Sequence, residues 1–241
     1  MNASRRKRQK QKAAKAISHQ KAPQGAQNNK LKNSGKVSSP LPAPESPLMR
    51  LSKSSPVPVA RIRDDPSFYL QALLPKERLK CLGTSPRSFS TKLIWAFPGP
   101  LAQFSLVVPG YMTSPSGFLK RSIEDGTYRR GPRSNNNSDG VRFVVFQSFT
   151  LTLEEQVDAV KRLRSKANLV MVVRSGKKSI EAWFSTKGFG QQEILKLRRF
   201  AIFLGAPASV FFDCHPYALP FCDGYNGKKT NRVIYWNPSA I

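Results

Sequence analysis

The chain has 241 residues, of which 40 are Lys or Arg and 14 are Asp or Glu, so its formal net charge is +26 at pH 7. The excess is spread along the chain, because residues 1–60 hold thirteen basic residues and one acid, and residues 61–241 hold twenty-seven and thirteen. Such a charge indicates a polyanionic partner. No apolar run approaches the roughly 20 residues of a membrane-spanning helix, which favours nucleic acid over a membrane.

The three cysteines are odd in number and sparse, which argues against the disulfide framework of a secreted protein. We therefore expect a soluble protein inside the cell. In a bacterium the expected location is the cytoplasm, in association with the nucleoid. In a eukaryote it is the nucleus.

Residues 1–60 are predicted to form a disordered basic tail. They include no aromatic residue and few large apolar ones, so they cannot bury enough surface to offset the entropy lost on ordering. The Ser- and Pro-rich part from Ser38 to Pro58 is predicted to be a semi-extended linker. The basic run Arg5–Lys10 fits a solvated tail, a nucleic-acid-binding arm or a nuclear localisation signal. One domain remains, at 61–241, with its core at 141–241.

The first part of this domain is predicted to be an N-terminal extension. Asp65 and Pro66 have the pattern of a helix N-terminus, and Pro75 ends the short amphipathic helix that follows. Strands are expected at Leu93–Phe97 and Phe104–Val108. Residues 111–137 are mostly Gly, Ser, Pro and Arg, which predicts a long loop.

Residues 142–236 alternate between strand-like and helix-like patterns. Thr152 and Glu155 have the spacing of a capping box, and Gly205 is a stop signal after the second helical pattern. The expected elements are strand Arg142–Phe149, helix Thr152–Lys166, strands Leu169–Val173 and Ser179–Phe184, helix Ile194–Leu204 and strand Arg232–Trp236. The order predicts an α+β fold with the split βαβ core (βαββαβ) of ferredoxin-like and RRM-like proteins. In that core both helices lie on one face of a four-stranded sheet.

Basic residues collect at three places that are predicted to contact phosphates. The turn of the central hairpin carries Arg174, Lys177, Lys178 and Ser179, the segment before the last strand carries Lys228 and Lys229, and the long loop carries Arg129, Arg130 and Arg133 beside Asn135–Asn137. A mobile loop without a ligand is the alternative for the third place. Trp183, Tyr235 and Trp236 are candidates for base stacking, with core packing as the alternative.

Several motifs of the core share their order and spacing with a known family. They are Arg142–Phe149, Ser175–Phe184, Leu204-Gly205-Ala206, Ala218-Leu219-Pro220, Asn226-Gly227-Lys228 and Val233–Pro238. In this series the chain resembles primase-like proteins of the archaeo-eukaryotic primase superfamily, as found in plasmid and phage replication modules. The resemblance runs from Val141 to the C-terminus and reaches back to Asp65.

The resemblance implies a degenerate catalytic site. Such primases hold divalent metals with carboxylates on the first core strand, bind nucleotide phosphate with a hairpin histidine, and carry an arginine before the Leu-Pro pair. The matching positions here are Gln147 and Phe149, which we expect side by side on one face of the strand, then Glu181 and Ala218. Mg²⁺ and Mn²⁺ need acidic oxygen ligands, which Gln and Phe do not supply.

Two acids remain as catalytic candidates. Asp213 follows Phe211 and Phe212 in the manner of a third primase motif, and a loop aspartate that caps nearby backbone is the alternative. Glu181 is expected to be a solvent-facing strand residue rather than a ligand. Cys214, His215 and Cys222 offer at most three zinc ligands of unusual spacing. We therefore expect no metal site and no cofactor.

These observations predict a nucleic-acid-binding, primase-like protein linked to DNA replication of a plasmid, phage or other mobile element, without nucleotidyl transferase activity. The expected partner is DNA rather than RNA, single-stranded or template–primer. One alternative is an active DNA primase-polymerase that uses Mg²⁺ or Mn²⁺ with Asp139, Glu181 and Asp213. Another is an RRM-like RNA-binding protein unrelated to primases, although no strand carries the aromatic-rich run of such sheets.

Overall fold

The structure of the chain, a computed structural model, describes residues 45–121, 128–222 and 231–241, with side chains in these ranges except residues 118–121 and 128–129. The helices are α1 Pro47–Lys53, α2 Pro66–Leu73, α3 Leu153–Arg164 and α4 Gln191–Phe203. The strands are β1 Lys80–Ser85, β2 Ser88–Lys92, β3 Leu106–Val107, β4 Gly117–Arg121, β5 Tyr128–Gly131, β6 Phe143–Gln147, β7 Leu169–Ser175, β8 Ile180–Ser185, β9 Tyr217–Ala218 and β10 Asn231–Trp236.

Six of these elements correspond to the predicted core. The capping box of Thr152 and Glu155 begins α3. Helix α4 ends at Phe203, and Gly205, two residues later, has a positive φ of 100°. The strands β7 and β8 pair as an antiparallel hairpin, and Gly176 in its turn has a φ of 98°. The α+β composition and the four-stranded antiparallel sheet are confirmed.

The order of this sheet is β10-β7-β8-β6. The strand β8 lies between β6 and β7, as in a split βαβ unit, but β10 pairs with β7. A ferredoxin-like or RRM-like sheet pairs its last strand with its first, which would place β10 beside β6. The difference has a structural cause, because the chain passes from α4 through β9, a strand of another sheet, before it reaches β10.

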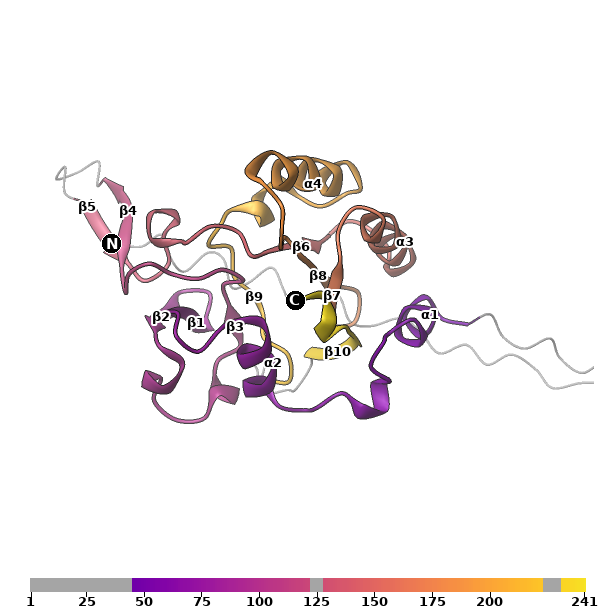
Figure 1. Cartoon of the computed structure of the whole chain (residues 1–241), viewed down its shortest axis with the longest axis horizontal. Helices are drawn as coiled ribbons and strands as arrows, with labels where there is room; N and C mark the ends of the chain where they lie inside the picture. The colour runs from indigo at the N-terminus through magenta and orange to yellow at the C-terminus, as the bar shows by residue number, and fades with distance from the viewer. Residues whose placement is uncertain (1–44, 122–127, 223–230) are drawn as a thin grey trace, which may run out of the picture. The chain divides into compact units, whose positions relative to one another are not determined.

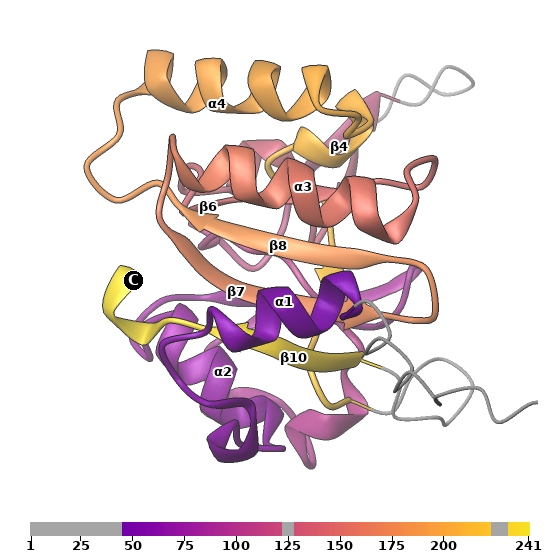
Figure 2. The same ribbon diagram turned by 90° about the vertical axis from the view of Figure 1, so that its right-hand side faces the viewer.

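The two faces of this sheet are covered by different elements (Figure 1; Figure 2). The helices α1, α3 and α4 cover one face, with Figure 2 showing them over the sheet. On the other face Trp236 of β10 packs edge-on against Tyr69 of α2, with their ring centroids 5.1 Å apart. Trp183 of β8 packs in the same way against Tyr217 of β9, with 5.8 Å between the ring centroids. Both faces therefore belong to the core.

The second sheet has the order β2-β1-β3-β9. Its first two strands were not predicted, because Lys80–Ser85 includes a lysine and a glycine instead of an alternating pattern. The glycine is required by packing, since a Cβ on Gly83 would lie 2.5 Å from the Phe89 ring of β2. The predicted strand Leu93–Phe97 is wrong, because a 3-10 turn occupies Ile94–Ala96. The long loop also contains the two strands β4 and β5.

The predicted start of order near residue 61 is also wrong. The helix α1 lies inside the segment assigned to tail and linker, with Leu51 buried against the core. Beyond it, the Val57 amide donates to the Trp236 carbonyl at 3.3 Å, so this segment lies along the edge of β10. A seven-residue helix is not stable alone, and tertiary contacts that local composition does not report stabilise it here. Residues 1–44 lie outside the described residues.

Candidate functional site

Three of the positions matched to primase motifs meet between the two sheets. The antiparallel register places Gln147 of β6 directly beside Glu181 of β8. The Gln147 Nε2 donates to Glu181 Oε1 at 3.2 Å, and the backbone N–H of Ala218 in β9 donates to Glu181 Oε2 at 3.0 Å. We call Gln147, Glu181 and Ala218 the Glu181 cluster. Both oxygens of its single carboxyl group have hydrogen-bond donors.

The Glu181 side chain is buried, so its expected position toward solvent is wrong. Only 3% of the residue is exposed, because β9 covers this face of β8. Burial raises the pKa of the Glu181 carboxyl to about 8, and the hydrogen bond from the Ala218 N–H acts in the opposite direction. The carboxyl group is thus largely protonated at neutral pH, and a protonated carboxyl is a poor ligand for Mg²⁺ or Mn²⁺.

Phe149 does not share a face with Gln147, which corrects the expectation that the two lie side by side. The strand β6 ends at Gln147, and the next residue, Ser148, donates from its hydroxyl to the Gly205 carbonyl at 2.8 Å. The chain therefore leaves the sheet toward the end of α4. Phe149 is 68% exposed and contributes nothing to the Glu181 cluster.

The other acids have partners of their own. Asp213 forms an ion pair with Arg198 of α4 at 2.6 Å, and Asp139 forms one with Arg78 at 3.4 Å. In the described ranges no group of three His, Cys, Asp or Glu side chains is placed to hold a metal ion. The residues at the matched positions thus do not supply the carboxylates with which, as the resemblance implies, such primases hold divalent metals.

The end of the β7–β8 hairpin is basic and open. Lys177 and Lys178 are exposed, and the half-buried Arg174 donates from Nε to the Gly176 carbonyl at 3.1 Å. On the neighbouring strand Arg232 is exposed and lies directly opposite Arg174. We call Arg174, Lys177, Lys178 and Arg232 the hairpin end.

Sequence reasoning did not single out Arg232, although it follows Lys228 and Lys229 at the start of a predicted strand. Like charges directly opposite each other on neighbouring strands are unfavourable. In the described part of the chain no carboxylate pairs with Arg174 or Arg232.

Ser179, also predicted to contact phosphate, is half-buried, and its hydroxyl accepts a hydrogen bond from Ser175 Oγ at 3.2 Å. Lys228 and Lys229 lie outside the described residues.

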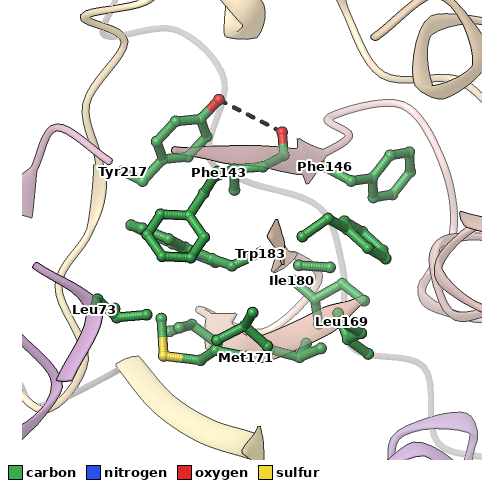
Figure 3. Packing of buried hydrophobic residues seen from close by; sticks show 14 of the residues in the cluster. Leu73, Phe143, Phe146, Leu169, Met171, Ile180, Trp183 and Tyr217 are labelled. Atoms are coloured by element: carbon green, nitrogen blue, oxygen red, sulfur yellow. Dashed lines mark hydrogen bonds between the residues drawn. The ribbon is translucent and has the colours of Figure 1, made fainter. Parts of the chain in front are cut away.

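The aromatic residues of the core sheet are unavailable for base stacking. Trp183, Tyr235 and Trp236 are each 3% exposed or less. Figure 3 shows Trp183 packed with Phe143 and Tyr217 on one side of the sheet. The Tyr217 hydroxyl donates to the Val210 carbonyl and lies 3.5 Å from the Val145 carbonyl. Core packing is the correct alternative for all three residues.

In the long loop the predicted residues have different roles. Asn137 is buried and structural, because its Oδ1 accepts from the Ser134 N–H at 3.0 Å and its Nδ2 donates to the Ser114 carbonyl at 2.9 Å. Arg133 stacks over the Phe89 ring, with its guanidinium carbon 4.4 Å from the ring centroid. Arg130 is exposed, and the side chain of Arg129 lies outside the described residues.

No protein-family model and no curated protein matches the sequence. Among solved structures, the AEP domain of the cyanophage S-2L primase-polymerase (PrimPol) is similar, with a TM-score of 0.44 and 14% sequence identity over 74% of this chain and 95% of that one. AEP denotes the archaeo-eukaryotic primases, the superfamily that the sequence motifs resemble. A likeness this distant transfers no activity, so the catalytic status of this chain depends on its own residues.

Proposed function

We propose that this chain is a nucleic-acid-binding, primase-like protein, linked to DNA replication of a plasmid, phage or other mobile element, and that it does not join nucleotides. One observation carries this proposal. Of the four positions that the sequence resemblance matches to catalytic residues, Gln147, Glu181 and Ala218 form the buried, hydrogen-bonded Glu181 cluster, and Phe149 lies outside it.

The cluster is unsuited to metal-assisted phosphoryl transfer. That chemistry needs anionic oxygen ligands around a divalent ion, and the ion lowers the barrier by neutralising charge that develops on the phosphate. Gln147 and Ala218 supply no anion, and the pKa of Glu181, raised to about 8 by burial, keeps its carboxyl largely neutral at pH 7. The three residues of the Glu181 cluster therefore supply no anionic ligand for such an ion at neutral pH.

Binding of nucleic acid does not need a metal, and the hairpin end supports it. Four cations lie around one turn and the neighbouring strand, and no carboxylate pairs with them in the described part of the chain. A phosphate between Arg174 and Arg232 would relieve the repulsion of the two guanidinium groups, and Lys177 and Lys178 extend the positive surface.

The alternatives have less support. An active primase-polymerase would use Asp139, Glu181 and Asp213, yet the first and last are ion-paired with arginines and Glu181 is enclosed. An RRM-like RNA-binding protein would need an aromatic sheet face open to bases, and Trp183 and Trp236 are buried. None of the helices in the described ranges is long and apolar enough to cross a bilayer.

The test is primer synthesis and primer extension by the purified full chain on single-stranded DNA, with Mg²⁺ or Mn²⁺, beside a binding titration on the same template. We expect binding without incorporation. Metal-dependent incorporation that Asp213→Ala or Glu181→Gln abolishes would promote the active alternative. Incorporation that survives both substitutions would indicate a contaminating polymerase, because neither acid would then take part.

A further inference from the structure

Arg133 lies at the centre of a surface that neither the Glu181 cluster nor the hairpin end includes. Its guanidinium stacks on Phe89 by one face. In the described part of the chain no carboxylate pairs with it. A guanidinium has five N–H donors in its plane, so stacking leaves them available for a planar or tetrahedral anion.

The backbone that carries Arg133 is held on both sides. The Thr91 hydroxyl of β2 donates to the Pro132 carbonyl at 2.6 Å. On the other side, the buried side chain of Asn137 binds the Ser134 N–H and the Ser114 carbonyl. These contacts place Arg133 before any ligand arrives, which lowers the entropic cost of binding.

Two hollows flank Arg133. One, of about 390 Å³, is lined by Arg133, Asn135, Asn136, Phe212, Cys214 and His215 among others. The other, of about 350 Å³, is lined by Arg87, Ser88, Phe89 and Arg133 among others. Both volumes fall at the lower end of the range of roughly 300–1,000 Å³ typical of small-ligand sites. Each has room for a single nucleotide unit.

The charge of this surface comes from its arginines. Among the described residues neither hollow is lined by a carboxylate, and Asp213, next to Phe212 in the chain, is paired with Arg198. Burial, followed by the charge of Arg133, lowers the pKa of His215, so the imidazole is neutral at pH 7. Burial raises the pKa of the Cys214 thiol to about 11, and its Sγ donates to Asn135 Oδ1 at 2.6 Å.

An aromatic ring is exposed beside these cations. Phe212 is 63% exposed at the rim of the larger hollow. Bases of single-stranded nucleic acid stack on exposed aromatic rings whatever their sequence, while the arginines of such a site bind the phosphates. The exposed amides of Asn135 and Asn136 add donors and acceptors for a base edge.

We propose that the two hollows around Arg133 form a second nucleic-acid site, which binds unpaired nucleotides of a single strand. Arg87 and Arg133 bind the phosphates and Phe212 stacks on a base. The site rests on the proposed function, nucleic-acid binding, and adds to it a preference for single strands. Sequence reasoning had placed Arg133 beside Asn135 and Asn136 as a phosphate contact. It did not connect them with Arg87, Phe89, Phe212 or His215, because these residues come from separate segments.

The experiment is an anisotropy titration of the full chain with a fluorescein-labelled oligo(dT) and with a random-sequence duplex of equal length. We expect Phe212→Ser to weaken binding to the single strand by about fivefold to a hundredfold, with little change for the duplex. Arg133→Gln and Arg87→Gln should each weaken single-strand binding and lower its salt slope by about 0.7. The matched controls are Phe203→Ser, an exposed phenylalanine of α4, and Arg199→Gln, an exposed arginine of the same helix.

The outcomes separate the two proposals. If the wild-type chain binds neither oligonucleotide, the proposed function itself fails. If it binds and Phe212→Ser acts no more strongly than Phe203→Ser, only the Arg133 site is overturned. An equal loss for duplex and single strand would also overturn it, because an intact duplex offers no unpaired base to stack. The same holds if polyglutamate competes as well as oligo(dT), since the surface would then fit an acidic protein.

Discussion

The Glu181 cluster and the hairpin end are neighbours on the β7–β8 hairpin, because Glu181 of β8 pairs with Val173 of β7, the residue before Arg174, yet their environments are opposite. Glu181, the second residue of β8, is buried under β9 with both carboxyl oxygens bonded. A few residues earlier Lys177 and Lys178 are exposed. The first place holds the two sheets together and the second is open to an anion. A substitution in the first should change stability, and one in the second should change binding.

The largest expected effect is from Glu181→Ala. It leaves the Ala218 N–H and the Gln147 amide buried without their acceptor and creates a cavity, so we expect the free energy of unfolding to fall by about 2–4 kcal/mol. Urea denaturation followed by tryptophan fluorescence measures this. Glu181→Gln is the control, because Gln keeps the volume and an acceptor oxygen. Equal stability of the alanine variant and the wild type would show that the two sheets do not depend on this contact.

The next effect is a dependence of stability on pH. The pKa of Glu181 is raised from 4.5 to about 8 in the folded chain, so the folded state keeps a proton that the unfolded state has lost. The protonated Glu181 contributes fully to the free energy of unfolding below about pH 4.5, and this contribution is lost as the pH rises through about 8. The free energy of unfolding falls by up to about 1.4 kcal/mol per pH unit over this range. The difference between the pH profiles of the wild type and Glu181→Gln isolates this group. Parallel profiles from pH 6 to 8 would contradict the assignment.

The core elements could be predicted because their signals are local. The capping box of Thr152, the glycines at positions 176 and 205 and the alternation of β8 all act within a few residues. The order of the strands could not be predicted, because it depends on a detour of the chain through β9. The burial of Glu181 was missed for the same reason, since the element that covers it is 37 residues away in the chain.

The residues of the candidate sites likewise fall into those that local sequence identifies and those that depend on contacts between distant segments. Runs of basic residues in the sequence identified the hairpin turn, because a turn exposes whatever side chains it carries. Arg232 and the Arg133 surface depend on pairing between distant segments, as in the register of β10 with β7. Periodicity shows which residues share a face but not what lies opposite them.

At the hairpin end, replacing Lys177 and Lys178 together by Gln should weaken binding to single-stranded DNA by about tenfold and lower the salt slope by about 0.7 for each phosphate that the variant no longer binds. Stability should change little, because both side chains are exposed. An anisotropy titration at several salt concentrations, beside a urea denaturation, measures both quantities. A decrease in stability with unchanged affinity would reverse the distinction between the hairpin end and the Glu181 cluster.

The smallest expected effect is that of Arg232→Gln, which should raise the stability of the fold and lower the affinity for nucleic acid. Arg232→Gln removes one of two guanidinium groups that lie directly opposite each other on β10 and β7, so at low salt it should stabilise the fold by about 0.2–1 kcal/mol. The same change removes a cation from the hairpin end, so it should weaken nucleic-acid binding. Arg199→Gln, on the outside of α4, is the control for loss of charge alone and should shift neither quantity as much. If an anion binds between Arg174 and Arg232, which have no carboxylate partner in the described part of the chain, it offsets this cost to stability. An Arg232→Gln variant that is less stable than the wild type, or that binds nucleic acid equally well, would contradict binding at this pair.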